Sequence, residues 1–320
     1  MAVHRFSVWV VACGLAWVSG AGADVWVSNA RGNNLVQLDG EGAVVRSLAV
    51  CQRPRHMVFS PDRKTLLVAC SDANQIARVD VQTWTLADTL ATRPGPDGLA
   101  LSPNGATAYV SVQDDSALLA YDLASKRQLF AASVGAEPEG VAASADGQRV
   151  YVVSEAANLL YCLDAQTGSL LWQAAVGTRP RRLAMAAQGH ELWVSNELGA
   201  SLSIVDAATG AALATLNLVV PGVPLADVKP VGMAISGDGR TMWVALGRAN
   251  RVAEVDVASR SVRGFVAVGK RPWGIALSRD GRRLYAANGL SDDVSVVDTA
   301  TRALLKTVPV GLQPHTVLAD

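Results

Sequence analysis

Basic, acidic and aromatic side chains gather beside prolines in this sequence of 320 residues. The basic and ring-bearing members are Arg53, Arg55, His56, Arg179, Arg181, Arg182, Lys229, Lys270, Arg271, Trp273 and His315. The acidic members are Asp97, Glu137 and Glu139. A guanidinium group presents a planar fork of donors to carboxylates, and an indole ring stacks on planar ligands or cations. These residue types predict a site for an anionic small molecule or for an acidic patch on a partner protein.

Motifs for covalent catalysis and cofactor attachment are missing from the sequence. It has no Cys-x-x-Cys-His string for haem, no Gly-x-Ser-x-Gly elbow and no Gly-x-x-x-x-Gly-Lys loop. Zinc needs three or four clustered ligands, yet only His56, His190 and His315 follow the first 23 residues. A metal shared by His56 and His315 is an alternative. We assign no catalytic residue, no metal and no covalently bound cofactor.

Two repeated markers indicate the elements that position these side chains. One is a proline, with spacings of 42, 42, 42, 42, 50 and 42 residues, at Pro54, Pro96, Pro138, Pro180, Pro230, Pro272 and Pro314. The other is an aspartate, with spacings of 41, 42, 42, 42, 50 and 42 residues, at Asp39, Asp80, Asp122, Asp164, Asp206, Asp256 and Asp298. Because both markers share one period, the chain repeats a single structural unit seven times.

Each unit has the pattern of four short β-strands. Apolar and polar residues alternate, β-branched residues are frequent, and Gly, Asp or Pro stands at the breaks, as in 274–278, 284–288 and 294–298. Paired helices would instead need apolar stripes at a spacing of 3.6 residues. We predict an all-β fold, a single seven-bladed β-propeller formed by residues 24–320, whose closed ring leaves no long sheet edge exposed.

The phase of the repeat predicts how the ring closes. Residues 24–29 form a second strand and residues 314–319 form a first, innermost strand, so these two segments should complete one blade. A large residue in each second strand should pack between neighbouring blades. These residues are Trp26, Leu67, Tyr109, Tyr151, Trp193, Trp243 and Tyr285.

The strand order brings the residues beside the prolines to one face of the ring, the top face, around the mouth of the central channel. The basic residues form an arc and the acidic ones lie opposite, an arrangement that would attract and orient a charged partner. The alternative is pairing within the ring, with loop carboxylates at Asp114, Asp115, Glu155 and Glu197. The insertion at 216–229 lies on the same face and is either a lid or a tolerated surface loop.

Charge balance and the first residues bear on partners and location. The sequence has 28 Lys and Arg against 28 Asp and Glu, with no block of like charges, which argues against nucleic acid binding. Residues 1–23 resemble a cleaved signal peptide, with a short apolar run and a final Ala-Gly-Ala. An uncleaved anchor or acylation at Cys13 are the alternatives. We expect a periplasmic or secreted chain that starts at Asp24 and has no membrane span.

Short stretches of the repeat are distinctive enough to compare with known families. They lie at 179–181, 193–196, 202–206, 208–210, 221–223, 229–233, 244–252 and 288–296. Through Trp-Val-Ser-Asn at 193–196 and the stretches after it, the chain resembles the YVTN-type β-propellers. Through Val-Ala-Leu-Gly-Arg-Ala-Asn-Arg-Val at 244–252 it is most similar to the propellers associated with PQQ-dependent alcohol catabolism. The resemblance covers about residues 24–314.

This resemblance implies an exported, seven-bladed, non-catalytic binding or accessory protein. The implied partners are a quinoprotein dehydrogenase, a c-type cytochrome or a transport component of the same pathway, and the implied ligand is PQQ or another anionic small molecule. The family offers no established catalytic residues to carry over. The alternatives are an enzyme of lactonase or quinoprotein-like type, and an envelope or surface structural protein.

Two cysteines depart from the repeat. Cys51 stands where other units have glycine, and Cys70 stands where several have asparagine. The glycines are Gly135, Gly177, Gly269 and Gly311, and the asparagines are Asn29, Asn196 and Asn288. Because both cysteines should lie near one corner of the top face, they are the one pair to test as a disulfide. We expect Cys162 to be a buried, small apolar residue.

Overall fold

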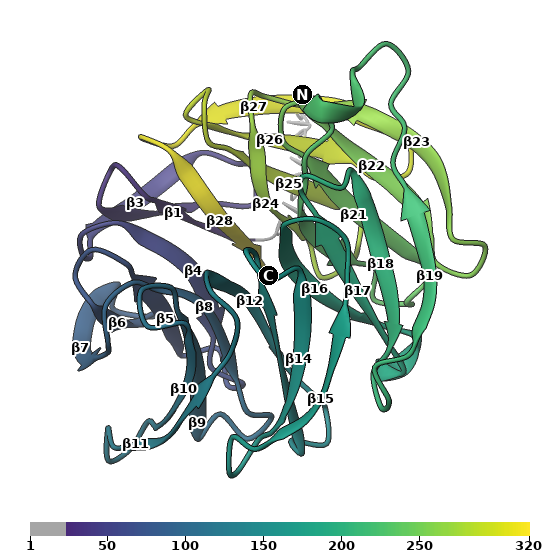
Figure 1. Ribbon diagram of the computed structural model, residues 1–320. Helices are drawn as coiled ribbons and strands as arrows, with labels where there is room; N and C mark the ends of the chain where they lie inside the picture. The colour runs from purple at the N-terminus through teal and green to yellow at the C-terminus, as the bar shows by residue number, and fades with distance from the viewer. Residues whose placement is uncertain (1–23) are drawn as a thin grey trace, which may run out of the picture.

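The computed structural model describes residues 24–320, which form a ring of seven four-stranded antiparallel sheets around a central channel (Figure 1). The prediction of an all-β, seven-bladed β-propeller is confirmed. The expected signal peptide, residues 1–23, lies outside the described residues. Within the part of the chain that is described, no helix is long and apolar enough to cross a membrane.

The blades are numbered around the ring, and the strands of each blade are given from the channel outward. Blade 1 has β28 (Pro314–Ala319), β1 (Val25–Asn29), β2 (Asn34–Leu38) and β3 (Val44–Ala49). Blade 2 has β4 (Pro54–Phe59), β5 (Thr65–Cys70), β6 (Gln75–Asp80) and β7 (Thr85–Ala91). Blade 3 has β8 (Pro96–Leu101), β9 (Thr107–Val112), β10 (Ala117–Asp122) and β11 (Gln128–Ser133). Blade 4 has β12 (Pro138–Ala143), β13 (Arg149–Ser154), β14 (Leu159–Asp164) and β15 (Leu170–Ala175).

The remaining three blades follow the same order. Blade 5 has β16 (Pro180–Ala186), β17 (Glu191–Asn196), β18 (Ser201–Asp206) and β19 (Ala212–Asn217). Blade 6 has β20 (Pro230–Ile235), β21 (Thr241–Leu246), β22 (Arg251–Asp256) and β23 (Ser261–Ala267). Blade 7 has β24 (Pro272–Leu277), β25 (Arg283–Asn288), β26 (Asp293–Asp298) and β27 (Ala303–Pro309). Two short 3-10 helices, η1 (Ala187–Gly189) and η2 (Leu225–Asp227), lie in connecting loops.

Blade 1 joins the two ends of the described chain, as the phase of the repeat predicts. β28 pairs antiparallel with β1, with Val317 opposite Val27. The Asp320 N–H donates to the Asp24 carbonyl at 3.0 Å. Each innermost strand also contacts the innermost strands of the two adjacent blades. The ring is therefore closed by strand pairing within blade 1.

The hydrophobic core lies between neighbouring blades. Trp193 of blade 5 is fully buried and packs with Met242 and Val244 of blade 6. The Tyr151 hydroxyl of blade 4 donates to the Ala207 carbonyl of blade 5 at 3.0 Å. All of the predicted packing residues are at most 3% exposed, namely Trp26, Leu67, Tyr109, Tyr151, Trp193, Trp243 and Tyr285. The prediction that they pack between blades is confirmed.

Every innermost strand has the same irregularity just after its proline. In β4, Pro54 pairs with Cys70 but Met57 pairs with Val68, so one extra residue lies between them. The register shifts in the same way after the proline that begins β8, β12, β16, β20, β24 and β28. A bulge of this kind re-aims side chains. It turns the residues that follow each proline toward the channel.

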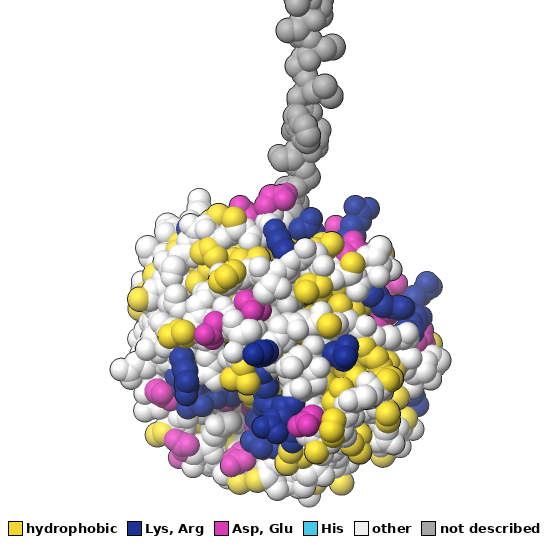
Figure 2. All heavy atoms as spheres, turned by 90° about the horizontal axis from the view of Figure 1, so that it is seen from above, with side chains coloured by type: hydrophobic (Ala, Val, Ile, Leu, Met, Phe, Trp, Pro, Cys, Tyr) yellow, Lys and Arg dark blue, Asp and Glu magenta, His cyan; other side chains and the backbone are white. Residues whose placement is uncertain are grey.

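The outermost strands form the rim of the ring. Some of their apolar side chains are exposed, such as Leu304 and Leu305 of β27. Figure 2 shows one side of the molecule, on which apolar and charged side chains are interspersed and a group of basic side chains lies near the lower edge. The binding site predicted from the sequence is instead at the centre of the ring.

Candidate ligand-binding site

The residue before each proline lies at the mouth of the channel. All seven have a positive φ, between 50° and 74°. They are Arg53, Gly95, Glu137, Arg179, Lys229, Arg271 and Gln313. The carbonyl of each accepts a hydrogen bond from the residue after the second strand of its blade; Glu155 N–H, for example, donates to the Glu137 carbonyl at 3.0 Å. This turn brings a loop side chain of each blade to the mouth, at the cost of a left-handed backbone in six non-glycine residues.

The residue after each proline lies in the bulge. From blade 2 round to blade 1 these residues are Arg55, Asp97, Glu139, Arg181, Val231, Trp273 and His315. Blades 2 to 5 therefore contribute two carboxylates flanked by two arginines. The other three blades contribute an aliphatic, an indole and an imidazole side chain.

Glu139 is the centre of a buried ion-pair network. It is fully buried, and its carboxylate lies 3.1 Å from Arg181 Nη1, 3.5 Å from Arg55 Nη2 and 3.7 Å from Arg182 Nη1. Asp97 is 1% exposed and lies 2.9 Å from Arg55 Nη2. Three guanidinium groups thus surround two carboxylates, which compensates for the desolvation of these buried charges.

Two loop carboxylates extend this network toward the mouth. Glu155 pairs with Arg181 Nη1 and accepts a hydrogen bond from Arg179 Nε at 2.8 Å. Glu197 accepts from Arg181 Nε at 2.6 Å and from Arg271 Nη2 at 2.9 Å. Arg181 is therefore held by carboxylates of blades 4 and 5 at once. Much of the basic arc is paired within the ring, which was the alternative that the sequence left open.

The buried carboxyl groups differ in protonation. Burial alone would raise the pKa of Glu139, but three neighbouring guanidinium groups, that of Arg181 above all, lower it to about 2. Burial and the charge of Glu139 raise the pKa of Glu155 to about 8, although Arg181 opposes this shift. At pH 7 Glu139 is therefore ionised and Glu155 is protonated.

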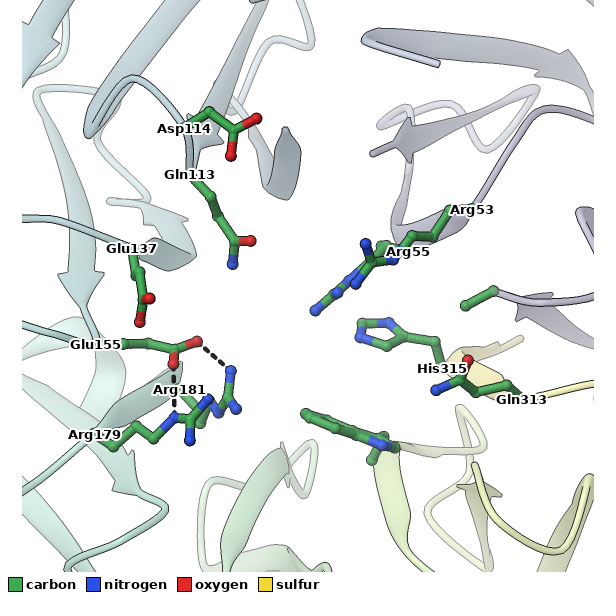
Figure 3. Close-up of a pocket in the computed structure, with 12 residues that line it drawn as sticks. Arg53, Arg55, Gln113, Asp114, Glu137, Glu155, Arg179, Arg181, Gln313 and His315 are labelled. Atoms are coloured by element: carbon green, nitrogen blue, oxygen red, sulfur yellow. Dashed lines mark hydrogen bonds and ion pairs between the residues drawn. The ribbon is translucent and has the colours of Figure 1, made fainter. Parts of the chain in front are cut away.

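A cavity of about 530 Å³, which we call the funnel, lies at the top of the network. It is lined by Ala30, Arg53, Arg55, Gln113, Asp114, Glu137, Glu155, Arg179, Arg181, Trp273, Gln313 and His315. In Figure 3, Arg55 and His315 point into the funnel from one side, and Glu155 faces them from the other. The dashed lines join Glu155 to Arg179 and Arg181.

Trp273 and His315 lie between the funnel and a deeper part of the channel. Their rings stack, with centroids 5.5 Å apart and an angle of 29°. The guanidinium carbons of Arg271 and Arg181 lie 4.9 Å and 5.3 Å from the centre of the indole ring. These cation–π contacts hold both arginines beside the funnel. A planar ligand would meet the edge of the indole ring or displace one of these groups.

Comparisons with known proteins agree with this architecture. The YNCE-like β-propeller family matches residues 16–283. The chain belongs to this family. No curated protein sequence matches it.

Solved structures resemble this YNCE-like propeller in fold at low sequence identity. Hydrazine synthase of Kuenenia stuttgartiensis is 20% identical, with a TM-score of 0.56 over 77% of this chain and 96% of that chain. A protein of unknown function from Desulfotomaculum acetoxidans is 13% identical, with a TM-score of 0.78 over 93% and 99%. A candidate 6-phosphogluconolactonase of Bacteroides fragilis is 16% identical, with a TM-score of 0.80 over 95% and 99%. These likenesses show the fold alone.

The predicted site residues of this YNCE-like propeller divide into three groups. Those that line the funnel are Arg53, Arg55, Glu137, Arg179, Arg181, Trp273 and His315. Those that lie in the network or the deeper channel are His56, Asp97, Glu139, Arg182 and Arg271. Lys229 and Lys270 belong to neither group, and within residues 24–320 they form no ion pair.

The predicted separation of charge around the mouth is wrong for two of the three acidic residues. Asp97 and Glu139 do not face the basic arc across an open mouth but are buried against arginines of it. The reason is that the bulge turns them inward, where Arg55 reaches past blade 3 to blade 4. Glu137 is exposed at the mouth as expected.

Sequence reasoning gave no binding role to several residues that line the funnel, including Gln113, Glu155 and Gln313. Gln113 and Glu155 occupy one repeat position, directly after the second strand. In the seven blades this position holds Ala30, Ser71, Gln113, Glu155, Glu197, Gly247 and Gly289. Each donates its N–H to the residue before the proline. The sequence analysis named Glu155 and Glu197 only as possible ion-pair partners of the basic arc; alignment of the units on this position would have placed Gln113 beside the channel with them.

The cysteines and the insertion lie outside the funnel and the ion-pair network. Cys51 and Cys70, the one pair that the sequence offered for testing, form a disulfide. Cys162 is free and buried, as expected. No group of three or more His, Cys, Asp or Glu side chains in the described residues is arranged to hold a metal ion. The insertion at 216–229 is anchored by three buried residues, Leu218, Val220 and Val228, in the core between blades 5 and 6.

Proposed function

We propose that this chain is an exported, non-catalytic binding protein that takes a multi-carboxylate molecule in the funnel. The observation that carries the proposal is an excess of positive charge in and around the funnel. Five arginines, Arg55, Arg179, Arg181, Arg182 and Arg271, face four carboxyl groups, Asp97, Glu139, Glu155 and Glu197. The funnel lining adds Arg53 against Asp114 and Glu137, so the arginines exceed the ionised carboxyl groups by one when Glu155 is protonated, and a bound anion would compensate this charge.

The size and the charge of the funnel suit a small anion with several carboxylates. Its volume of about 530 Å³ lies within the range of small-molecule sites. Arg53 and Arg179 are 49% and 41% exposed at the mouth, so they are accessible to carboxylates. PQQ is planar and carries several carboxylates, and the resemblance to PQQ-associated propellers makes it the first ligand to test. On this proposal the physiological partner is a quinoprotein dehydrogenase, a c-type cytochrome or a transport component of PQQ-dependent alcohol oxidation.

Export is supported by the disulfide. Cys51 and Cys70 are bonded to each other. Structural disulfides persist mainly in oxidising compartments such as the periplasm. The disulfide and the predicted signal peptide therefore support the same location.

The test is calorimetric titration of PQQ into the purified chain at two ionic strengths. We expect binding that weakens with salt and falls at least tenfold in Arg53→Glu and in Arg179→Glu, since both changes reverse a charge that lines the funnel. Arg127→Glu is the matched control, because Arg127 is exposed in the turn between β10 and β11 on the opposite face. Equal affinity in all four proteins, or no binding to the wild type, would contradict the proposal.

Catalysis is the competing outcome. The fold is shared with a candidate lactonase, so lactone hydrolysis is measured in parallel with binding. Turnover of a lactone that Glu155→Gln abolishes would replace the binding function with an enzymatic one. We expect no turnover.

A further inference from the structure

A second cavity, of about 190 Å³, lies deeper in the channel, beyond Trp273 and His315. We call it the chamber. Four blades have glycine two residues after the proline, namely Gly98, Gly140, Gly232 and Gly274, and two of these, Gly232 and Gly274, line the chamber. A Cβ at Gly232 or Gly274 would lie 2.1 Å or 2.6 Å from a carbonyl oxygen of the next inner strand. The glycines thus allow the innermost strands to pack closely around the chamber.

The chamber has one apolar wall and one polar wall. The apolar wall is formed by Leu183, Val231, Met233, Ile275, Val317 and Leu318. The polar wall is formed by His56, Arg182 and His315. Of the described residues that line the chamber, none is acidic. This pattern suits a ligand with an apolar body and an anionic group at one end.

The two histidines are neutral. The Leu99 N–H donates to His56 Nδ1 at 3.1 Å, so the hydrogen of the neutral ring is on Nε2. Burial and the charge of Arg182 lower the pKa of His56 to about 3. His315 is 5% exposed, its Nδ1 lies 3.1 Å from Thr316 Oγ1, and its Nε2 has no hydrogen-bond partner. When the Thr316 hydroxyl donates to Nδ1, Nε2 of His315 is an unused donor.

Arg182 is the most loosely paired guanidinium of the network. Its nearest carboxylates, Glu139 and Asp97, are 3.7 Å and 3.8 Å away. Both have a closer partner, Arg181 at 3.1 Å and Arg55 at 2.9 Å respectively. Arg182 Nη1 is buried and has no hydrogen-bond partner. The chamber therefore contains a buried cation that its own chain does not fully satisfy.

We propose that the chamber is a second binding site, for a small monocarboxylate with an apolar body. The carboxylate accepts hydrogen bonds from Arg182, His56 and His315, and the body packs on the apolar wall. Benzoate has a suitable size, since a cavity of about 150 Å³ lined by apolar side chains accommodates benzene. This site shares Trp273 and His315 with the funnel, but it does not depend on the function proposed for the funnel.

The test uses benzoate as the probe, with benzyl alcohol as its uncharged counterpart, in calorimetric titrations of the whole chain. We expect benzoate to bind at least tenfold more tightly than benzyl alcohol. Arg182→Gln should weaken benzoate at least tenfold, because a charge-assisted bond is lost. Met233→Phe should also weaken it at least tenfold, because the larger ring fills the chamber.

Two further arms separate this site from the funnel. Arg53→Glu, which changes a residue that lines only the funnel, should leave benzoate affinity within twofold of the wild type. Met233→Phe should leave PQQ affinity within twofold. Met233→Phe changes no charge, so it preserves the test if Arg182→Gln does not fold. Absence of benzoate binding, equal binding of benzyl alcohol, or full benzoate affinity in Met233→Phe would each overturn the proposal.

Discussion

Glu139 and Glu155 belong to one buried network but have different charges at neutral pH. The pKa of Glu139 is held near 2 by arginines, whereas burial and the charge of Glu139 raise the pKa of Glu155 to about 8. Substitution by glutamine therefore has a different effect on charge at Glu139 than at Glu155. At Glu139 it removes a charge that three arginines surround, and at Glu155 it replaces a carboxyl that is already neutral.

We predict that Glu139→Gln lowers the free energy of unfolding at pH 7 by about 3 kcal/mol, because it leaves buried guanidinium groups without their partner. Glu155→Gln should not lower it. Urea unfolding of both variants and the wild type measures the difference. A Glu155→Gln protein as unstable as Glu139→Gln would show that Glu155 is ionised in the folded state.

The raised pKa of Glu155 predicts that the stability of the protein depends on pH. Folding raises the pKa of Glu155 from 4.5 to about 8, so its contribution is fully present below pH 4.5 and is lost as pH rises through 8. We therefore expect the stability of Glu155→Gln relative to the wild type to increase between pH 5 and pH 8. Urea midpoints measured at four pH values test this. A constant difference would contradict the raised pKa.

Ligand affinity should respond to the same titration. Above pH 8 Glu155 adds a negative charge to the funnel, so a fully ionised tricarboxylate should bind more weakly at pH 9 than at pH 7. His315, which also lines the funnel, does not change its charge in this pH range, because burial lowers its pKa well below the ordinary value. Calorimetry with benzene-1,3,5-tricarboxylate tests this, and Glu155→Gln should remove most of the pH dependence.

At the scale of the element, the disulfide replaces a contact that other blades make without a covalent bond. In blade 5 a Cβ at Gly177 would lie 2.5 Å from the Asn196 side chain, and the same holds for Gly269 with Asn288 in blade 7. In those blades asparagine at the end of the second strand packs directly on the glycine. In blade 2 the bond between Cys51 and Cys70 joins the same two positions.

We predict that reduction of this disulfide, which encloses a sequence separation of 19 residues, lowers stability by about 3 kcal/mol and the melting temperature by several degrees. Thermal unfolding with and without reductant measures the effect. The Cys51→Ala/Cys70→Ala double variant should melt like the reduced protein and should not respond to reductant. A reductant effect that persists in the double variant would mean that the bond between Cys51 and Cys70 is not its source.

The period of the sequence was sufficient to predict the elements and their order, because strand patterning and the turn residues are local properties. It also indicated which residues lie beside the channel, since position relative to the proline sets their height. It did not indicate how they pair. Arg55 of blade 2 reaches Glu139 of blade 4 only because the channel is narrow and the bulges turn both inward. Channel width is a property of the closed ring and is not encoded in any one unit.

At the scale of the whole molecule, closure of the ring has two effects: it brings a binding residue into the channel and it covers a strand edge. β28 supplies His315 to the funnel and the chamber, and it covers the edge of β1. Val317 of β28 is 2% exposed and belongs to the core shared by blades 1 and 7. The last strand thus links stability to the integrity of both cavities.

We predict that deletion of residues 314–320 lowers stability by several kcal/mol, at about 25 cal/mol per Å² of apolar area exposed, and promotes association through the uncovered edge of β1. Thermal unfolding and light scattering measure these effects. Deletion of Asp320 alone is the control. It removes a surface ion pair with Arg63 and two backbone hydrogen bonds, to Asp24 and from Arg279, but it leaves β28 in place, so it should cost much less than the larger deletion. A synthetic peptide of residues 314–320 should restore the melting temperature of the truncated chain, because it can pair with β1 again. An unchanged melting temperature after the larger deletion would mean that strand pairing in blade 1 does not hold the ring together.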